Sequence, residues 1–191
     1  MLFFIVYNSK MEGKMKIFFD MDGTLSEFDK TAGPDKWSAP GYARTLKPLE
    51  NVVGAVKAFI RNQKYFSEKV EVFICSAVVS MDYAVEDKIA WLKEQGIDIP
   101  RENMIFVPYG RSKAKAILDS GITIEDGDLF VDDYTKNLQE VHYNTKLVAV
   151  KLLNGINDTN KSWKFDRISA FSCPASIQRQ LIGIGLLSKA S

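Results

Sequence analysis

The stretch KIFFDMDGT, residues 16–24, decides the fold class of this chain. A short apolar run ends in an acidic turn, a pattern typical of a buried strand followed by a loop at the edge of a sheet. Similar apolar runs recur at 70–75, 104–107, 129–131 and 147–150, with segments of helical spacing between them. Strands that are almost wholly apolar are typical of parallel sheets covered on both faces. The sequence therefore predicts an α/β fold with a parallel sheet of about five strands flanked by helices.

The helices are placed by apolar periodicity and by residues that start or stop a helix. We expect helices over 48–60, 81–95 and 112–118, the last of these capped by its serine, and a final helix that begins at Pro174. Proline at a helix start and serine at a cap are the expected signals at these positions. The alternation of strand and helix therefore continues along most of the chain.

These elements divide the chain into three parts. Residues 15–153 form the core, and residues 154–191 form a tail whose helix packs on that core. Residues 1–14 are either an added edge strand or the product of an upstream start codon, and their apolar run is far shorter than the roughly 20 residues of a membrane span. Residues 25–45 have no predicted element of their own, and we interpret them as a short cap inserted after the first strand.

Composition excludes several classes of function. The 191 residues are 46% hydrophobic and 26% charged, with 25 basic against 24 acidic side chains, which gives a net charge of +1. Such a balance disfavours a nucleic-acid or membrane-surface binder. Cys75 and Cys173 lack metal-binding spacing, and Cys75 lies in an apolar run, so we expect a reduced, buried thiol and a cytoplasmic protein. The single histidine, His142, is expected at the surface after a helix end.

Polar residues stand at the ends of the predicted strands or in the loops that follow. Because the carboxyl ends of parallel strands meet at one edge of a sheet, we expect these side chains to converge. Four carboxylates in one crevice would repel each other unless a cation lay among them, and their hard oxygen ligands favour Mg²⁺. A lysine and a hydroxyl beside that metal suit the oxygens of a phosphoryl group. The set consists of Asp20, Asp22, Ser76, Lys113 with Lys115 as its alternative, Asp132 and Asp133.

The order and spacing of this set resemble the haloacid dehalogenase (HAD) superfamily, specifically its phosphatase branch. The motif Asp-x-Asp-Gly-(Thr/Val) matches residues 20–24, and an apolar strand that ends in serine matches 73–76. Lys113 is our choice for the lysine at a helix start, and residues 129–133 match the strand that ends in an acidic pair. The resemblance covers about residues 15–153 and implies a Rossmann-like core with an inserted cap.

Within the superfamily the chain is most similar to the 5′(3′)-deoxyribonucleotidase group. The similarity lies in the Asp-Met-Asp-Gly opening, the short insert after it, and the sequence Leu-Lys-Pro at 46–48 before the next helix. The insert at 25–45 is shorter than the helical cap of that group. The resemblance therefore implies a phosphatase more directly than it implies a nucleotidase.

The resemblance also implies a role for each residue. Asp20 would attack phosphorus and form an aspartyl-phosphate, and Asp22 would act as general acid and then general base. Because HAD dehalogenases generally lack the second aspartate, Asp22 favours phosphate esters. The Asp20 carboxylate, the Asp22 backbone carbonyl and Asp133 would hold Mg²⁺. Asp132 would orient Lys113, and Lys113 and Ser76 would bind phosphoryl oxygens. Gly23 and Thr24 complete the first motif.

The cap carries the candidate substrate contacts. Three aromatic residues, Phe28, Trp37 and Tyr42, lie in or beside it, and aromatic faces can stack on a planar base. The alternative is that these aromatics anchor the cap to the core. We expect a small phosphorylated metabolite as substrate, with nucleoside monophosphates, and deoxyribonucleotides first, as the leading candidates. Basic residues that could attract an anion also lie nearby: Lys30, Lys36 and Arg44.

Three rival functions are compatible with an acidic cluster on a parallel sheet. One is a HAD phosphatase for another small phosphate ester. A second is a phosphate-accepting receiver-like signalling domain, in which the acidic pair follows the first strand and the acceptor ends a middle strand. Here the Asp-x-Asp pair ends the first strand instead, at residues 20–22. A partner-binding remnant is the third, disfavoured because a chemically competent residue fills every motif position.

Overall fold

A computed structural model describes residues 14–61, 69–79, 82–157 and 162–190. Within these ranges, six parallel strands form one sheet in the order β3-β2-β1-β4-β5-β6. This is the Rossmann order, in which the direction of winding reverses between β1 and β4. It differs from the 2-1-3-4-5 order of receiver-like domains. The strands are Met15–Phe19 (β1), Val70–Val78 (β2), Met104–Pro108 (β3), Leu129–Asp132 (β4), Val148–Leu153 (β5) and Arg167–Ser169 (β6).

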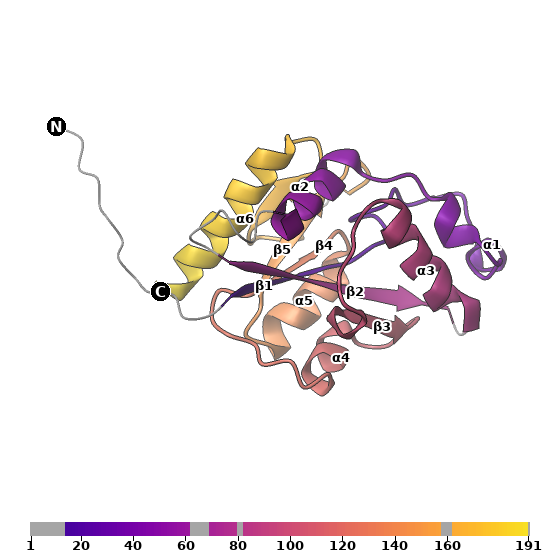
Figure 1. Cartoon of the computed structure of the whole chain (residues 1–191). Coiled ribbons are helices and arrows are strands. Elements are labelled where there is room, and N and C mark those ends of the chain that lie inside the picture. The colour runs from indigo at the N-terminus through magenta and orange to yellow at the C-terminus, as the bar shows by residue number, and fades with distance from the viewer. Residues whose placement is uncertain (1–13, 62–68, 80–81, 158–161, 191) are drawn as a thin grey trace.

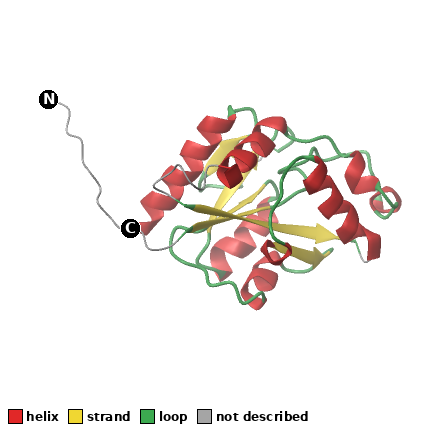
Figure 2. Cartoon of the chain, in the orientation of Figure 1, coloured by secondary structure: helices red, strands yellow, loops and turns green. Residues whose placement is uncertain are grey.

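Helices cover both faces of this sheet (Figure 1; Figure 2 shows the same view coloured by element type). Residues from α2, α3 and α6 share one apolar core with the sheet, and residues from α4 and α5 share a second core on the other face. The helices are Pro34–Trp37 (α1), Glu50–Arg61 (α2), Asp82–Glu94 (α3), Lys113–Asp119 (α4), Thr135–Asn144 (α5) and Pro174–Lys189 (α6), with 3₁₀ turns at Tyr42–Thr45 (η1) and Arg101–Asn103 (η3).

The central strand β1 supplies both cores because side chains alternate along a strand. Ile17 and Phe19 belong to the core under α2, α3 and α6, whereas Phe18 belongs to the other and stacks on Phe73 with ring centroids 4.7 Å apart. All three side chains are fully buried. Two-sided burial explains why this strand is a continuous apolar run, and it confirms the predicted parallel α/β architecture.

The structure corrects several details of the sequence analysis. A sixth strand, β6, lies in the predicted tail; only its central residue is buried, so it lacks the apolar signature of the others. The stretch 25–45 contains two short helical segments, α1 and η1. His142 lies within α5, half-buried, with its ring centroid 4.1 Å from that of Phe165. Apart from residue 14, the proposals for 1–14 fall outside the described residues.

Cys75 is buried as expected, and burial raises the pKa of its thiol to about 12. Within the described ranges, no helix has both the length and the apolar character needed to cross a lipid bilayer.

α6 packs closely against the start of β1 and the loop before β4. A Cβ atom on Gly185 would lie 2.5 Å from Cε of Met15 and 2.7 Å from the carbonyl oxygen of Gly127. Gly183, on the same helix, has open space where its Cβ would stand. The two glycines therefore form a matched pair for testing how α6 packs.

We expect Gly185→Ala to lower the free energy of unfolding by about 1–3 kcal/mol, because the new methyl overpacks the contact with Gly127. Gly183→Ala is expected to raise it by up to about 1 kcal/mol, because alanine favours helix more than glycine does. Urea unfolding of the two variants measures both effects. Equal effects of the two substitutions would contradict the close packing of α6.

Candidate active site

The candidate site lies where the winding of the sheet reverses, at the carboxyl ends of β1 and β4. Asp20 follows β1, and its backbone N–H donates to the carbonyl of Val131 in β4 at 2.9 Å. Asp132, the last residue of β4, is fully buried beside it. Ligands of open parallel sheets bind in this crevice, because adjacent strand ends there lead their loops apart.

The turn after β1 requires glycine at position 23. Gly23 has φ of 80°, and a Cβ there would lie 2.5 Å from Oδ2 of Asp133. The backbones of Thr24, Leu25 and Ser26 all donate to the carbonyl of Met21, which closes the turn. The first motif thus folds tightly enough to bring the loop after β1 against the acidic pair after β4.

Lys113 is the basic group that the structure places between the two buried aspartates. Its Nζ lies 2.6 Å from Oδ1 of Asp20 and 2.8 Å from Oδ2 of Asp132. It is the first residue of α4, whose cap Ser112 accepts a hydrogen bond from the backbone N–H of Lys115. The Lys115 side chain is exposed and pairs with Asp119 instead. Of the two lysines considered, Lys113 is therefore the one at the site.

Three carboxylates converge beside Lys113. One oxygen from each of Asp20, Asp132 and Asp133 lies within 4.8 Å of the others. Burial, reinforced by Asp132, raises the pKa of Asp20 to about 7 even though Lys113 opposes the shift; burial and the carboxylates of Asp132 and Asp20 raise that of Asp133 to about 8. Burial disfavours the charged form of Lys113, but the Asp132 and Asp20 carboxylates outweigh this and raise its pKa.

This donor set fits a divalent cation. Among the described residues, three carboxylates converge here and one ammonium group, that of Lys113, pairs with two of them. Carboxylate oxygens are the ligands that Mg²⁺ prefers. Asp132 is already engaged, since it accepts from Lys113, the Tyr134 backbone and Asn137. Asp20 and Asp133 are therefore the carboxylates with capacity left for a metal.

Residues within and just after β5 hold Asp133 in place. Nδ2 of Asn154 donates to the Gly23 carbonyl at 2.7 Å and to Oδ2 of Asp133 at 3.2 Å. Nδ2 of Asn157 and Nζ of Lys151 both donate to the backbone carbonyl of Asp133, at 2.9 and 3.2 Å. Sequence reasoning missed all three residues. The one signal was Lys151, a charged residue inside the apolar run of β5.

A second lysine, Lys88 of α3, was also missed. Its Nζ lies 2.5 Å from Oδ2 of Asp22 and donates to Oγ of Ser76 at 2.8 Å. Lys88 is only 6% exposed and lies on the same helix face as the buried residues Ala84 and Trp91. A charged residue within this apolar stripe was the signal that could have revealed it.

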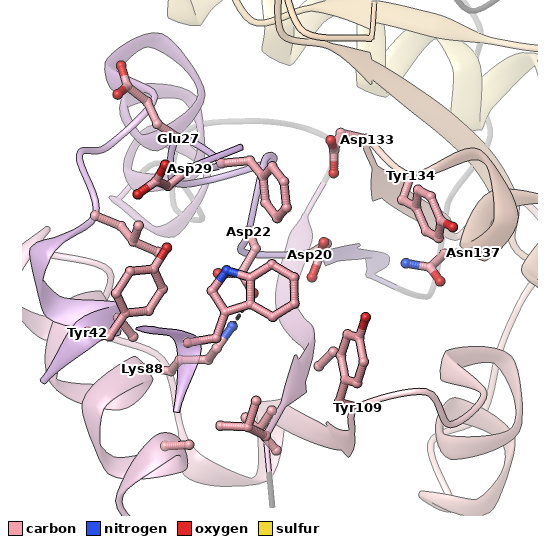
Figure 3. A pocket seen from close by; sticks show the side chains of 18 of the residues that line it. Asp20, Asp22, Glu27, Asp29, Tyr42, Lys88, Tyr109, Asp133, Tyr134 and Asn137 are labelled. Atoms are coloured by element: carbon pink, nitrogen blue, oxygen red, sulfur yellow. Dashed lines mark hydrogen bonds and ion pairs between the residues drawn. The ribbon is translucent and has the colours of Figure 1, made fainter. Parts of the chain in front are cut away.

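A cavity of about 520 Å³ opens from these groups toward the cap. Its inner end is lined by Asp20, Asp22, Lys88, Lys113 and Asp133, most of which are visible in Figure 3. Of the residues that the structure describes, six aromatic side chains line the remainder, three of them predicted from the cap and three tyrosines not predicted. They are Phe28, Trp37, Tyr42, Tyr83, Tyr109 and Tyr134.

The aromatic residues of the cap contact each other and the loop after β3. The ring centroids of Phe28 and Trp37 are 6.3 Å apart, and those of Trp37 and Tyr109 are 6.1 Å apart, both pairs tilted. All four aromatic residues Phe28, Trp37, Tyr42 and Tyr109 also face the cavity. The cap aromatics therefore serve both as packing residues and as cavity wall.

The basic residues near the cap are not part of the cavity wall. Lys36 pairs with Asp29 at 2.6 Å, and Arg44 pairs with Glu94 of α3. Lys30 is exposed, and none of the three lines the cavity. The expectation that they would bind an anion receives no support from their placement.

Comparison with solved structures finds a similar fold. The HAD domain of the effector protein Lem4 from Legionella pneumophila, in an inactive mutant form, superimposes with a TM-score of 0.53 over 93% of this chain and 97% of that domain, at 14% sequence identity. The chain has the fold of a HAD domain. No family model and no curated protein matches the sequence. At this identity the likeness concerns the fold, while the site rests on the geometry described above.

We expect Mg²⁺ to raise the melting temperature of the protein. A ligand at about 100 times its Kd stabilises by about 2.7 kcal/mol, or roughly 5–10 °C for a chain of this size. Asp133→Asn removes one carboxylate ligand and should abolish most of this shift. The control Asp119→Asn, at an exposed aspartate paired with Lys115, should retain it. Calorimetry with and without Mg²⁺ measures both; an undiminished shift in Asp133→Asn would exclude this cluster as the metal site.

The raised pKa values of Asp20 and Asp133 predict a pH dependence. In the folded, metal-free protein these groups bind protons more tightly than in the unfolded chain, so stability is lost as pH rises from about 4, where the unfolded carboxyl groups ionise, through about 7 to 8. Mg²⁺ competes with those protons, and its stabilising effect should be larger at pH 9 than at pH 6. The same Mg²⁺-induced shift in melting temperature at both pH values would contradict the assignment.

Proposed function

We propose that this protein is a Mg²⁺-dependent phosphomonoesterase that acts through an aspartyl-phosphate. The observation that carries the proposal is the position of Asp20, held by Lys113 at the inner end of the cavity, with Asp133 beside it and Asp22 facing the same cavity. A nucleophile, a cation, a general acid and a candidate metal site thus share one crevice. The HAD fold supports this reaction class.

The residues have distinct roles in the proposed reaction. A carboxylate oxygen of Asp20 attacks phosphorus and the ester P–O bond breaks, while Asp22 gives a proton to the leaving oxygen. Water then attacks the phosphorus of the aspartyl-phosphate, Asp22 accepts its proton, and the bond to Asp20 breaks to release phosphate. Lys113 stabilises charge on the equatorial oxygens. Bound by Asp20 and Asp133, Mg²⁺ would supply charge neutralisation for the carboxylates and the phosphoryl group.

The cavity wall favours a neutral, planar leaving group. Among the described lining residues, the cations Lys88, Lys113 and Lys151 lie beside the acidic cluster. The outer part of the wall is aromatic, with the carboxylates of Glu27, Asp29 and Asp87. An aromatic wall suits a planar ring, and the absence of a lining cation there disfavours a second anionic group. The nucleoside of a nucleoside monophosphate is a neutral leaving group with a planar base, and we propose deoxyribonucleotides as the first substrate class to test.

Asp20→Asn is expected to lower phosphatase activity to background while the fold and the melting temperature are largely kept. The reason is that the amide cannot serve as the nucleophile. A panel of phosphate monoesters, assayed with Mg²⁺ and with excess chelator, measures the effect, and Asp119→Asn is the control. Wild-type-like activity in Asp20→Asn, or full activity in chelator, would contradict the mechanism. Stable phosphorylation of Asp20 without turnover would favour the receiver-like alternative.

Trp37→Ala is expected to raise KM for a deoxynucleoside monophosphate more than for a generic aryl phosphate. The larger ring system of the base loses a stacking surface, which corresponds to about 0.5–1.5 kcal/mol or roughly 2–10-fold in KM. Phe171→Ala is a suitable control, because Phe171 is exposed and does not line the cavity. Equal effects of Trp37→Ala on both substrates would instead indicate that the cap aromatics only hold the cap in place.

A further inference from the structure

Ser76 occupies an unexpected position for a residue that is to bind phosphate. It lies within β2, which continues to Val78, and its side chain is fully buried. Its hydroxyl accepts a hydrogen bond from Nζ of Lys88 at 2.8 Å. The neighbouring residues Ala77 and Val78 line the cavity, whereas Ser76 is absent from the described lining. A phosphoryl oxygen in the cavity would therefore meet Lys88 before it could meet Ser76.

Lys88 has the properties of an anion-binding group. It lines the cavity, is only 6% exposed, and approaches Asp22 through the same Nζ atom, as Figure 3 shows. An ammonium group has three N–H donors, and the contacts to Asp22 and Ser76 use two of them. No other acceptor among the described residues contacts Nζ, so one donor remains on a cation whose positive charge is weakly solvated. Because Asp22 itself is 34% exposed, the ion pair can open without burying an unpaired carboxylate.

We propose that Lys88 makes the phosphoryl contact beside the end of β2, and that Ser76 is a positioning residue that orients the Lys88 ammonium. This inference rests on the proposed phosphatase function. A phosphoryl oxygen that accepts from the third N–H of Lys88 shares the charge of this ammonium group with Asp22, and so weakens the ion pair between Lys88 and Asp22. The Asp22 carboxyl group is then available to the leaving oxygen, so that substrate binding and the placement of the general acid depend on one lysine.

Affinity for inorganic phosphate in the presence of Mg²⁺ tests the contact directly, both as a Kd by calorimetry and as a Ki against ester hydrolysis. A hydrogen bond to a charged group contributes about 1.5–3 kcal/mol, so Lys88→Met should weaken phosphate binding roughly 10–150-fold. Lys88→Arg, which keeps the charge, should retain most of the affinity. Unchanged affinity in Lys88→Met would overturn the proposal.

A double-mutant cycle tests the role of Ser76. If Ser76 acts only through Lys88, Ser76→Ala weakens phosphate binding in the wild-type background and has no further effect in the Lys88→Met background. If Ser76 contacts phosphate itself, the two effects add, and the positioning role is wrong. If Ser76 has a purely structural role, Ser76→Ala lowers the melting temperature equally in both backgrounds, and its effect on the Ki for phosphate does not depend on Lys88.

Two controls separate the possible failures. The Mg²⁺-induced rise in melting temperature should persist in Lys88→Met, because the Asp20 and Asp133 carboxylates are untouched. Loss of this rise in both Lys88→Met and Lys88→Gln would show that Lys88 maintains the site as a whole. That result would overturn the proposal. Failure of the wild-type protein to bind phosphate or to hydrolyse any ester would contradict the proposed function itself, independently of Lys88.

Discussion

The site depends on one buried ammonium group. Lys113 lies between Asp20 and Asp132, and without it two carboxylates would be buried side by side with no opposing charge. Removing the cation from a buried ion pair typically costs about 3–5 kcal/mol, because it leaves a carboxylate buried without an opposing charge. The interaction also fixes the first turn of α4 against the ends of β1 and β4, so that the same contact positions the helix and the site residues.

The sequence predicts the fold well where burial produces a strong pattern. β1, β2, β4 and β5 are apolar on both faces, and their runs of apolar residues locate them within a few residues. β6 escapes prediction because an edge strand of three residues with one buried side chain carries little periodic signal. The 3₁₀ turn η1 of the cap escapes for a related reason, since hydrogen bonds between its flanking residues and α3 hold it, and it has no buried face of its own.

The same distinction applies to the site. Asp20, Asp132 and Asp133 could be predicted to meet because parallel strands bring their carboxyl ends to one edge. Lys88 and Asn154 reach the site from a helix and from a loop, and their positions depend on tertiary packing that no local pattern encodes. The distinction between Lys113 and Lys115 depends on which of them faces the core in the first turn of α4. Residues two positions apart lie on nearly opposite sides of a helix, and the sequence alone does not fix which side faces inward.

The cap leaves the core and returns to it at adjacent points. The Glu27 backbone donates to the Lys47 carbonyl and that of Leu49 donates to Leu25, both at 2.7 Å, so the insert enters and exits through one short ladder. Closing a loop whose ends are already joined costs little more when the loop is lengthened. The residues between these hydrogen bonds, 28–46, comprise most of the cap and are therefore exchangeable. A longer or different insert could replace them and change the leaving group accepted, while the catalytic aspartates and lysines remain as they are.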